Sequence, residues 1–315
     1  MNINYLILAH NNPKQLLRLV RHLNEPDVYF YIHIDKKANQ LLFEKILMSY
    51  QNLKFVPLRK RKKIHWGDVS MVTATLELMN QVSEDQRNGY SILLSAQDYP
   101  ITSNQYIYDF LKRNYGKSFI SLFKIPHPGW ENGGLPRLNK YKINKSSQRK
   151  HFLMLPSIFD REFYSWETFG KINFLRKTGR WRKVFNIFKK RKFPDLLEPF
   201  GGGQWWALPI EIVNRILSFH NTHPEYLKYH KYTLAPDEIF FHSIIAFLQK
   251  EKHFDIKRSL TYVNWERPSG PLPITFLKED FDELKEASKN HLFARKFDIE
   301  RDTEILDEID KELLN

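Results

Sequence analysis

Short apolar runs alternate with amphipathic segments along the first 125 residues, and this alternation limits the fold more than any other feature of the sequence. Runs rich in β-branched and aromatic residues predict strands, whereas apolar residues spaced three and four apart predict helices. The predicted strands are residues 4–10, 28–35, 53–57, 90–96 and 118–123, and the predicted helices are 13–23, 39–50, 68–82 and 103–114. Alternation at this spacing indicates an α/β fold with a Rossmann-like, mostly parallel sheet flanked by helices.

The pattern weakens between about residues 126 and 200, where the chain is basic, aromatic and irregular, and it then returns. A strand at 204–209, a helix at 210–220 and a long apolar helix at 236–250 are predicted. The 315 residues suffice for one large core, and no low-complexity linker divides them. We therefore predict one domain, 1–315, in which residues 126–200 form a basic insertion between two halves, 1–125 and 201–315.

The sequence contains no cysteine, which excludes disulfides, thiolate metal sites and thiol nucleophiles. Absence of cysteine also fits a reducing compartment, so we expect a cytoplasmic protein. No stretch approaches the roughly 18 to 20 apolar residues of a membrane span. The N-terminal sequence MNINYLILAHNN lacks the basic region and the cleavage site of a signal peptide, and its apolar run is expected to be a buried strand.

Positive charge is concentrated in one part of the chain. The formal net charge is +13, and residues 137–192 alone hold 17 Lys or Arg against three acids. One local surface is therefore expected to face an anionic partner. Residues 176–193 mix cations with aromatic and aliphatic side chains, which is typical of segments that lie on anionic membranes. We expect peripheral contact with the inner face of a membrane there, and a solvated basic face is the alternative.

Three polar side chains, His10, Asp35 and Asp98, fall at or just past the ends of predicted strands. Doubly wound sheets bind ligands at this edge. Asp35 could accept hydrogen bonds from a ribose or a base while Lys37 meets a phosphate, or both could belong to a charged surface loop. Asp98 could be held rigidly in a cleft, or it could form a turn before Pro100.

No GxGxxG or Walker A motif follows the first predicted strand, so neither a dinucleotide fingerprint nor a P-loop is supported. The glycines at 201–203 do not stand between a strand and a helix, and we expect a tight backbone turn there. Trp66 and Gly67 precede a helix that Asp68 is expected to cap. Packing of the indole at the start of that helix is the structural alternative for this motif.

Residues 234–241, LAPDEIFF, place two carboxylates directly before an apolar run. Asp is a good N-cap and Glu suits the first turn of a helix, so both could simply start a helix. Alternatively, one of the two could be a catalytic base. Taken alone, these eight residues do not decide between the two interpretations.

Seven motifs, in order, decide it by resemblance: YLILAHNNPKQLLRLVRHL, FYIHIDKKA, WGDVSMVTATL, LLSAQDYPI, GGGQWWALP, APDEIFFHSII and HLFARKFD. They resemble the core-2/I-branching N-acetylglucosaminyltransferase and peptide O-xylosyltransferase family over residues 5–298. The resemblance implies a GT-A-type fold, an inverting mechanism, a UDP-sugar donor and no need for a divalent metal. The chain departs from the family in its strongly basic region 137–200 and in lacking the disulfide cysteines of the secreted animal members.

The resemblance also implies roles for individual residues. Glu238 matches the family's catalytic base, and Asp237 would then be the cap that fixes the turn. Arg295 and Lys296 match basic residues that contact the diphosphate, where two fixed cations can stabilise the leaving group as a metal would. The residues implied for the donor are His10, Asp35, Lys37, Trp66, Gly67, Val263, Arg295 and Lys296, and those for the acceptor are Asp98, Trp130, Trp205, Trp206, Asp237 and Trp265.

Indole faces stack on sugar rings, but tryptophans also fill cores, and we expect one of Trp205 and Trp206 to be a core residue. Metal-dependent relatives carry a DxD at the end of an apolar strand. Here the candidate metal-binding DxD, Asp280-Phe281-Asp282, follows no predicted strand and is expected to start a helix. We therefore predict no metal site.

The sequence thus predicts a single GT-A-type domain in which 1–125 binds the nucleotide sugar and 201–315 carries the acceptor and catalytic half. We expect transfer of N-acetylglucosamine or xylose from a UDP-sugar to a hydroxyl of a glycan or peptide, in the assembly of surface polysaccharide or glycoconjugate. The alternatives are a basic nucleic-acid-binding protein and a catalytically idle sugar-binding relative. No nucleic-acid-binding motif is present, so we expect no nucleic acid partner, and the presence of Glu238, Arg295 and Lys296 argues against an idle relative.

Overall fold

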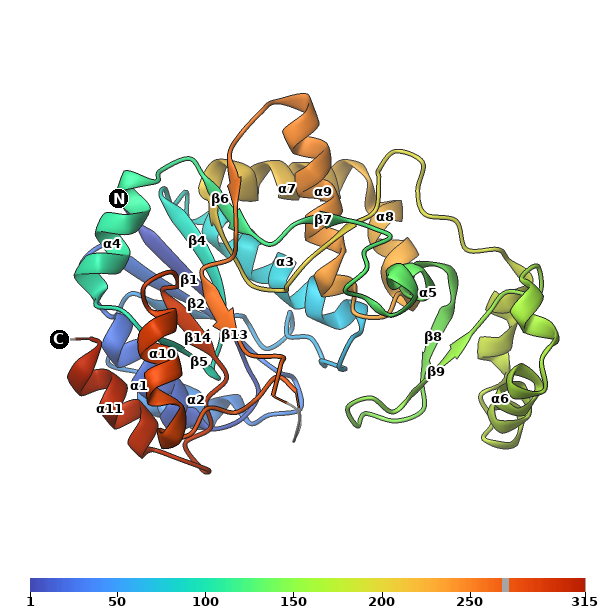
Figure 1. Cartoon of the computed structure of the whole chain (residues 1–315), viewed down its shortest axis with the longest axis horizontal. Coiled ribbons are helices and arrows are strands. Elements are labelled where there is room, and N and C mark those ends of the chain that lie inside the picture. Colours follow the sequence, from blue (N-terminus) through green and yellow to red (C-terminus); the bar gives the residue numbers. More distant parts are fainter. Residues whose placement is uncertain (268–271, 315) are drawn as a thin grey trace.

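The structure is a computed structural model that describes residues 1–267 and 272–314, without the side chain of Lys183. A seven-stranded sheet with the order β12-β6-β11-β4-β1-β2-β3 forms its centre (Figure 1). The strands are β1 Ile3–Ala9, β2 Val28–Ile34, β3 Leu53–Phe55, β4 Tyr90–Ser95, β6 Ser118–Ile120, β11 Trp206–Pro209 and β12 Ile256–Lys257. Strand β11 runs antiparallel to both of its neighbours, whereas β1 pairs in parallel with β2 and β4. The predicted α/β fold with a mostly parallel sheet is confirmed.

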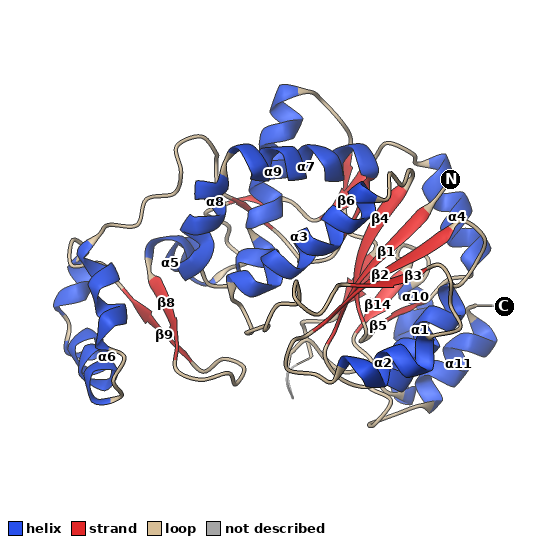
Figure 2. Cartoon of the chain, turned by 180° about the vertical axis from the view of Figure 1, so that it is seen from behind, coloured by secondary structure: helices blue, strands red, loops and turns tan. Residues whose placement is uncertain are grey.

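Helices cover both faces of this sheet (Figure 2). One face packs against α1 Pro13–Leu23, α2 Gln40–Leu47, α4 Asn104–Arg113, α10 Phe281–Ala287 and α11 Glu304–Glu312, and the other against α3 Val69–Glu84, α7 Ile210–Thr222 and α9 Phe240–Glu251, with α8 Pro224–Tyr229 beside them. Alternate residues of β1 serve the two cores: Tyr5 and Ile7 face α1, whereas Leu6 and Leu8 face α3. The unbroken apolar strands predicted from the sequence are therefore buried on both sides.

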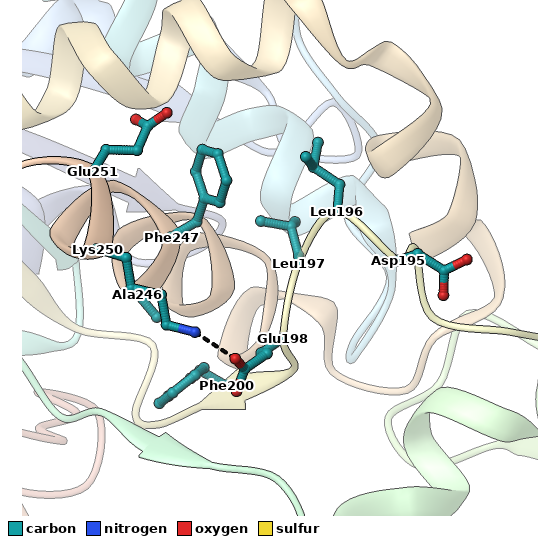
Figure 3. A pocket seen from close by; sticks show the side chains of 9 residues that line it. All are labelled: Asp195, Leu196, Leu197, Glu198, Phe200, Ala246, Phe247, Lys250 and Glu251. Atoms are coloured by element: carbon teal, nitrogen blue, oxygen red, sulfur yellow. Dashed lines mark hydrogen bonds and ion pairs between the residues drawn. The ribbon is translucent and has the colours of Figure 1, made fainter.

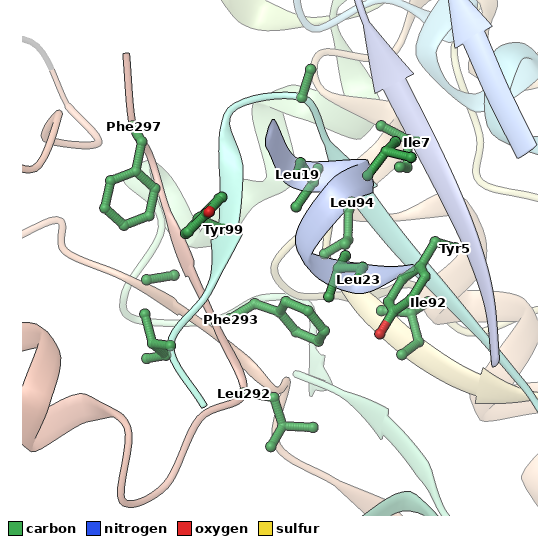
Figure 4. Close-up of a cluster of buried hydrophobic side chains, with 14 of the residues drawn as sticks. Tyr5, Ile7, Leu19, Leu23, Ile92, Leu94, Tyr99, Leu292, Phe293 and Phe297 are labelled. Atoms are coloured by element: carbon green, nitrogen blue, oxygen red, sulfur yellow. The ribbon is translucent and has the colours of Figure 1, made fainter. Parts of the chain in front are cut away.

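A second, three-stranded sheet joins the C-terminal segment to the main body. It consists of β13 Thr261–Val263, β14 Phe293–Arg295 and β5 Asp98–Pro100. Phe293 of β14 packs edge-on against Tyr5 of the central sheet, with ring centroids 6.1 Å apart, within the cluster drawn in Figure 4. This buried contact fixes the C-terminal strand beside the end of β4, nearly 200 residues earlier in the chain.

The region after residue 125 is more regular than the sequence predicted. Strands β8 Tyr141–Asn144 and β9 Phe152–Leu155 form an antiparallel hairpin, followed by α6 Trp166–Lys177 and a 3-10 segment, η3 Trp181–Phe188. Residues 141–188, here called the lobe, project away from the central sheet (Figure 1) and have a small core of their own. That core contains Tyr141, Ile143, Leu155, Leu175 and Ile187.

The remaining elements are short, and one of them, η2 Arg161–Tyr164, lies within the lobe. The others are β7 Phe123–Lys124, η1 Glu131–Gly134, α5 Leu135–Asn139, β10 Phe200–Gly201, η4 His230–Tyr232, η5 Pro236–Glu238 and η6 Lys278–Asp280. The predicted strand 118–123 ends at Ile120, because β7 pairs with β10 instead of the central sheet. Within the described residues, no helix is long and apolar enough to cross a membrane.

The predicted cap at Asp68 is confirmed, whereas the predicted cap at Asp237 is not. Asp68 accepts a hydrogen bond from the Ser70 amide, and Ser103 accepts one from the Tyr106 amide. The predicted helix 236–250 is broken, because Ile239 (φ −133°, ψ −43°) separates the 3-10 turn η5 from α9. The prediction that Asp237 caps this helix is therefore wrong: Asp237 lies inside η5, and α9 has no side-chain cap.

Candidate active site

One edge of the central sheet gathers most of the predicted site residues. His10 follows β1, Asp35 follows β2, and Asp98 lies just past β4. Because β11 is antiparallel to β4, its first end lies at the same edge, and Trp205 directly precedes it. Desolvation by the surrounding protein lowers the pKa of His10, and the charges of Asp35 and Arg295 also act on this ring. The predicted convergence of polar groups on one rim is confirmed.

Asp35 is fixed in a buried pocket. Its Oδ1 accepts hydrogen bonds from the amides of Lys37 (2.9 Å) and Ile64 (3.3 Å), and its Oδ2 lies 3.3 Å from Lys37 Nζ. The buried guanidinium of Arg61 donates to the carbonyl oxygens of Asp35 and Ala38 and so holds the loop. A carboxylate only 4% exposed excludes the alternative of a solvated surface loop.

Arg295 is held between a carboxylate and an indole. It lies opposite Asp98 in the β14–β5 pair and opposite Val263 in the β13–β14 pair. Its Nη1 donates to Asp98 Oδ1 (2.5 Å) and to the Ser95 hydroxyl, and its guanidinium carbon lies 4.4 Å from the Trp205 ring centroid. This clamp gives the guanidinium a fixed position at the end of β4.

Asp98 does not face open solvent. It is 1% exposed, and it accepts hydrogen bonds from the Ser95 amide (2.7 Å) and hydroxyl (2.9 Å) as well as from Arg295. Burial raises the pKa of Asp98, and the charge of Arg295 opposes that rise. Both carboxylate oxygens thus hold Ser95 and Arg295, and the predicted contact between Asp98 and an acceptor stays a prediction.

A third cation, which the sequence analysis missed, joins Arg295 and Lys296. Arg149, in the turn between β8 and β9, donates to the carbonyl oxygen of Leu272 (2.9 Å), and its guanidinium carbon lies 5.4 Å from the Trp66 ring centroid. Two residues beyond Leu272, the Ile274 carbonyl receives the amide of Lys296 (3.5 Å). The only sequence signal for Arg149 was the general excess of charge in 137–192.

These three cations repel one another. Burial lowers the pKa of Lys296 most, and the charges of Arg149 and Arg295 lower it further. Burial, followed by the charge of Arg295, likewise lowers the pKa of Arg149. Among the described residues, neither Arg149 nor Lys296 forms an ion pair with an acid, so their positive charge is available to an anionic ligand.

Glu238 lies farther along the same edge. Its carboxylate Oε2 forms an ion pair with Arg137 of α5, and the guanidinium carbon of Arg137 lies 3.8 Å from the Trp130 ring centroid. The Glu238 carbonyl accepts the Gly202 amide (3.0 Å), just before β11. The side chain is 28% exposed, so one carboxylate is both positioned and accessible.

Close backbone approach explains the glycines at 201–203. A Cβ on Gly202 would lie 1.8 Å from the carbonyl oxygen of Ser121, and one on Gly201 would lie 2.6 Å from the Trp130 ring. A Cβ on Gly203 would meet nothing within 4 Å. Two of the three glycines therefore let the segment carrying Glu238 lie directly against the end of β6.

Asp237 is buried beside Glu238. Burial, and then the neighbouring charge of Glu238, raise the pKa of Asp237 to about 7, although Arg137 and Lys142 oppose the rise. Within the described chain, its Oδ1 has no hydrogen-bond partner. The side chain is 7% exposed, and the predicted acceptor role of Asp237 stays a prediction.

The lobe also reaches the Trp66 loop through Lys142 of β8. Its buried Nζ donates to Asn144 Oδ1 (2.7 Å) and to the Trp66 carbonyl oxygen (3.2 Å) and lies 3.7 Å from Asp68 Oδ2. Burial lowers the pKa of Lys142. On the other side of this loop, the Gly67 carbonyl accepts the Ala235 amide (3.1 Å), which links the loop to η5.

The predicted tryptophans have different environments. Trp206 is 2% exposed and packs near Phe241, so its predicted acceptor contact is wrong and the expectation of one core tryptophan is confirmed. Trp205 is 7% exposed and supports Arg295. Trp66, stacked on Phe152, and Trp265 keep accessible faces, with 37% and 56% of their surface exposed.

The DxD at 280–282 lies at a helix start, as predicted. Asp280 Oδ2 accepts the Leu277 amide (2.9 Å), its Oδ1 pairs with Arg267, and α10 begins at Phe281. In the part of the chain that the structure describes, no group of three or more His, Asp or Glu side chains could together hold a metal ion.

A cavity of about 370 Å³ lies away from these residues (Figure 3). It is lined by Asp195, Leu196, Leu197, Glu198, Phe200, Ala246, Phe247, Lys250 and Glu251. Lys250 and Glu198 form an ion pair at the side of the cavity, and none of the predicted site residues lines the cavity. This cavity is therefore separate from the candidate active site.

Comparison with known proteins agrees with the resemblance in the motifs. The family model for the core-2/I-branching enzyme matches residues 3–285. Xylosyltransferase 2 of Pan troglodytes is 27% identical over 330 residues, which cover 98% of this chain and 33% of that protein. Xylosyltransferase 1 of Homo sapiens is 25% identical over 331 residues, covering 98% of this chain and 30% of that protein. The chain thus spans about a third of the length of these curated relatives.

A solved 4-diphosphocytidyl-2C-methyl-D-erythritol synthase from Anaerococcus prevotii is 10% identical, with a TM-score of 0.39 over 91% of this chain and 95% of the other. That likeness is too weak to carry an argument. The family match, by contrast, covers residues 3–285 and includes His10, Asp35, Asp98 and Glu238. The chain belongs to the core-2/I-branching enzyme family.

Proposed function

We propose that this protein is an inverting glycosyltransferase that moves a sugar from a UDP-sugar to a hydroxyl of a glycan or peptide. The carrying observation is the placement of one accessible carboxylate, Glu238, and three cations, Arg149, Arg295 and Lys296, along one edge of a Rossmann-like sheet. The xylosyltransferase relatives favour xylose as the sugar, with N-acetylglucosamine as the other candidate. The GT-A arrangement that the motifs imply fits the same edge.

Glu238 is the proposed base. The acceptor oxygen attacks the anomeric carbon, the bond from that carbon to the UDP oxygen breaks with its electron pair, and the acceptor proton moves to Glu238. Arg137 pairs with Oε2, which leaves Oε1 to take the proton. Since one displacement inverts the anomeric centre, no second carboxylate is required as a nucleophile.

The three cations are proposed to hold the diphosphate. Negative charge develops on the departing UDP, and fixed cations near it stabilise the transition state without reorganisation. Arg295 is clamped by Asp98 and Trp205, whereas Arg149 and Lys296 carry charge that no described acid neutralises. This arrangement supports a transfer that does not depend on a divalent metal.

The test measures UDP released from UDP-xylose, UDP-N-acetylglucosamine and UDP-glucose, with and without EDTA, alongside UDP binding by calorimetry. We expect turnover of one donor that EDTA does not change. Loss of turnover in EDTA would contradict the metal-independent mechanism, and failure of UDP to bind would contradict the donor class. Glu238→Gln is expected to bind UDP normally and to lose transfer. Equal activity of Glu238→Gln would refute the base assignment and favour another residue.

A further inference from the structure

The lobe exposes aromatic side chains far more than the rest of the protein does. Eight aromatic residues with more than a third of their surface exposed fall between residues 159 and 188. They are Phe159, Tyr164, Trp166, Phe169, Phe174, Trp181, Phe185 and Phe188, here called the aromatic set. Only four others occur in the remainder of the described chain: Trp66, Tyr106, Tyr115 and Trp265. A concentration of this kind marks an interaction surface and not random surface exposure.

The aromatic set lies outside the core of the lobe. In α6, Thr168 and Leu175 are buried, whereas Trp166 is 92% exposed and Phe169 45% exposed. The ring centroids of Trp166 and Phe169 are 6.4 Å apart. Helical geometry places Trp166 and Phe169 on the opposite side of α6 from its buried residues. These rings therefore contact each other instead of the body of the protein.

The 3-10 segment η3 repeats this arrangement. Ile187 is buried in the core of the lobe, while Trp181, Phe185 and Phe188 are each at least half exposed. Centroids of Trp181 and Phe185 are 5.4 Å apart, and those of Phe185 and Phe188 are 6.4 Å apart. Two neighbouring elements of the lobe thus each present a row of adjoining aromatic rings.

Unneutralised cations accompany these rings. Residues 176–193 contain no acid. In the described part of the chain, no ion pair is formed by the exposed cations Arg176, Lys177, Arg182, Lys189 and Lys190. Of the three lobe acids, Glu162 and Glu167 are paired with Lys140 and Lys171, and Asp160 accepts the Ser157 amide (2.9 Å). The field at this surface is therefore strongly positive, and the chemistry that complements it combines negative charge with an apolar layer.

We propose that the aromatic set and its adjoining cations dock this protein on the surface of an anionic lipid bilayer. Aromatic rings enter the boundary between head groups and acyl chains, and Lys and Arg side chains meet the lipid phosphates. Of the aromatic set, five residues lie outside the segment 176–193 that the sequence pointed to, so the surface is larger than predicted. Docking does not require the proposed transferase activity.

Docking would also place the candidate active site near the lipid surface. The lobe that bears the aromatic set supplies Lys142 to the Trp66 loop and Arg149 to the cation group. Resting on the proposed function, an acceptor carried on a lipid anchor is the substrate class that suits this placement. A soluble glycan or peptide acceptor would not be brought closer to the active site by docking on the membrane.

The experiment measures sedimentation of the full chain with vesicles of phosphatidylcholine alone and of phosphatidylcholine with phosphatidylglycerol, at low and high salt. We expect binding to the anionic vesicles that falls with salt. The charge variant Arg182→Gln/Lys189→Gln/Lys190→Gln should bind about a hundredfold more weakly, because each basic residue near an anionic surface contributes several-fold. The aromatic variant Trp181→Ser/Phe185→Ser/Phe188→Ser should bind at least roughly tenfold more weakly.

A matched control changes exposed apolar residues of the body, Leu41→Ser/Met48→Ser/Leu58→Ser, which are 69%, 77% and 65% exposed. This control should bind vesicles as the wild type does. Thermal unfolding of each variant shows that loss of binding is not loss of fold, and the charge variant removes no apolar contact. UDP binding is measured on the same samples, so failure of docking and failure of the proposed function remain distinguishable.

Results of three kinds would overturn the proposal, the third of which is preference for another partner. The first is no sedimentation with anionic vesicles, and the second is equal binding to both vesicle types at both salt concentrations. The third is tighter binding to a single-stranded oligonucleotide than to vesicles, or a dimer that the aromatic variant dissociates while vesicle binding stays unchanged.

Discussion

Arg137 forms an ion pair with Glu238 across 101 residues of the chain, and its guanidinium also stacks on the Trp130 ring. The pair fixes the orientation of the proposed base.

Substituting Arg137→Met should reduce kcat about tenfold to a hundredfold, since small misplacement of a catalytic group has effects of this size. The KM for the donor should stay unchanged. The control Arg21→Met, on the exposed surface of α1, should behave as the wild type. A rise in donor KM without a change in kcat would show that Arg137 serves the donor.

Removal of the third cation should weaken binding of the diphosphate. Charge-assisted contacts are worth about 1.5–3 kcal/mol, so Arg149→Ala should weaken UDP binding by roughly tenfold or more. Uridine, which has no phosphate, should bind the variant and the wild type equally. Calorimetry with both ligands makes the comparison, and Arg113→Ala on α4 is the control. Equal losses for uridine and UDP would indicate a collapsed site instead of a lost phosphate contact.

The buried carboxyl of Asp237 should leave a signature in stability against pH. Because its pKa in the folded state, about 7, lies above the ordinary value of 3.8, the folded protein keeps the proton while the unfolded chain has lost it. Stability therefore falls as pH rises from about 4 to about 7, by at most about 4 kcal/mol. Asp237→Asn should remove this loss.

Denaturant unfolding of the wild type and of Asp237→Asn at pH 5 and pH 8 checks this prediction. The variant should gain stability over the wild type on going from pH 5 to pH 8. An identical pH dependence in both proteins would mean that Asp237 titrates normally.

The adjoining glycines provide a matched pair. Gly202→Ala should lower the melting temperature and the activity together, because its Cβ would collide with the Ser121 carbonyl and displace the segment that bonds Glu238. A Cβ on Gly203 would meet nothing within 4 Å, so Gly203→Ala should change neither the melting temperature nor the activity. Similar losses in both variants would contradict the close approach.

Two tryptophans should separate stability from substrate contact. Trp206→Ala should reduce the free energy of unfolding by about 3–5 kcal/mol, as expected for a large buried aromatic residue. Trp265→Ala, which changes a side chain 56% exposed, should alter that free energy by less than about 0.5 kcal/mol. Its acceptor KM should rise. A stability loss in Trp265→Ala comparable to that of Trp206→Ala would place Trp265 in the core.

The elements of the first half could be predicted from the sequence because their signals are local. Short apolar runs identified β1, β2 and β4, and period-3.6 patterns identified α1 and α3; parallel order then brought His10 and Asp35 to one edge. Glu238 and Arg295 were reached through resemblance, since no local pattern distinguishes a catalytic carboxylate from a helix start. Their contacts are made with residues far away in the sequence, so no short stretch of the sequence could predict them.

The lobe resisted prediction for a different reason. Helix α6 carries aromatic residues on its exposed side as well as apolar residues on its buried side, so its hydrophobic periodicity is almost lost. The break at Ile239 could not be predicted either, because Ile239 begins a mostly apolar stretch that runs to Ile245 and contains only two polar residues, His242 and Ser243. Arg149 could not be distinguished from the other cations by sequence, because its position near Arg295 and Lys296 depends on where the β8–β9 turn lies in the folded protein.

The β8–β9 hairpin makes the insertion an inseparable part of this protein. Lys142 braces the Trp66 loop from one of its strands, and Arg149 projects from its turn toward Arg295 and Lys296. A family member with a shorter insertion would lose the brace and the third cation in one step, and it would need to recruit positive charge from another loop. Differences in insertion length within the family should therefore be accompanied by a relocated basic residue, and chimeras that exchange insertions should fail unless that residue travels with them.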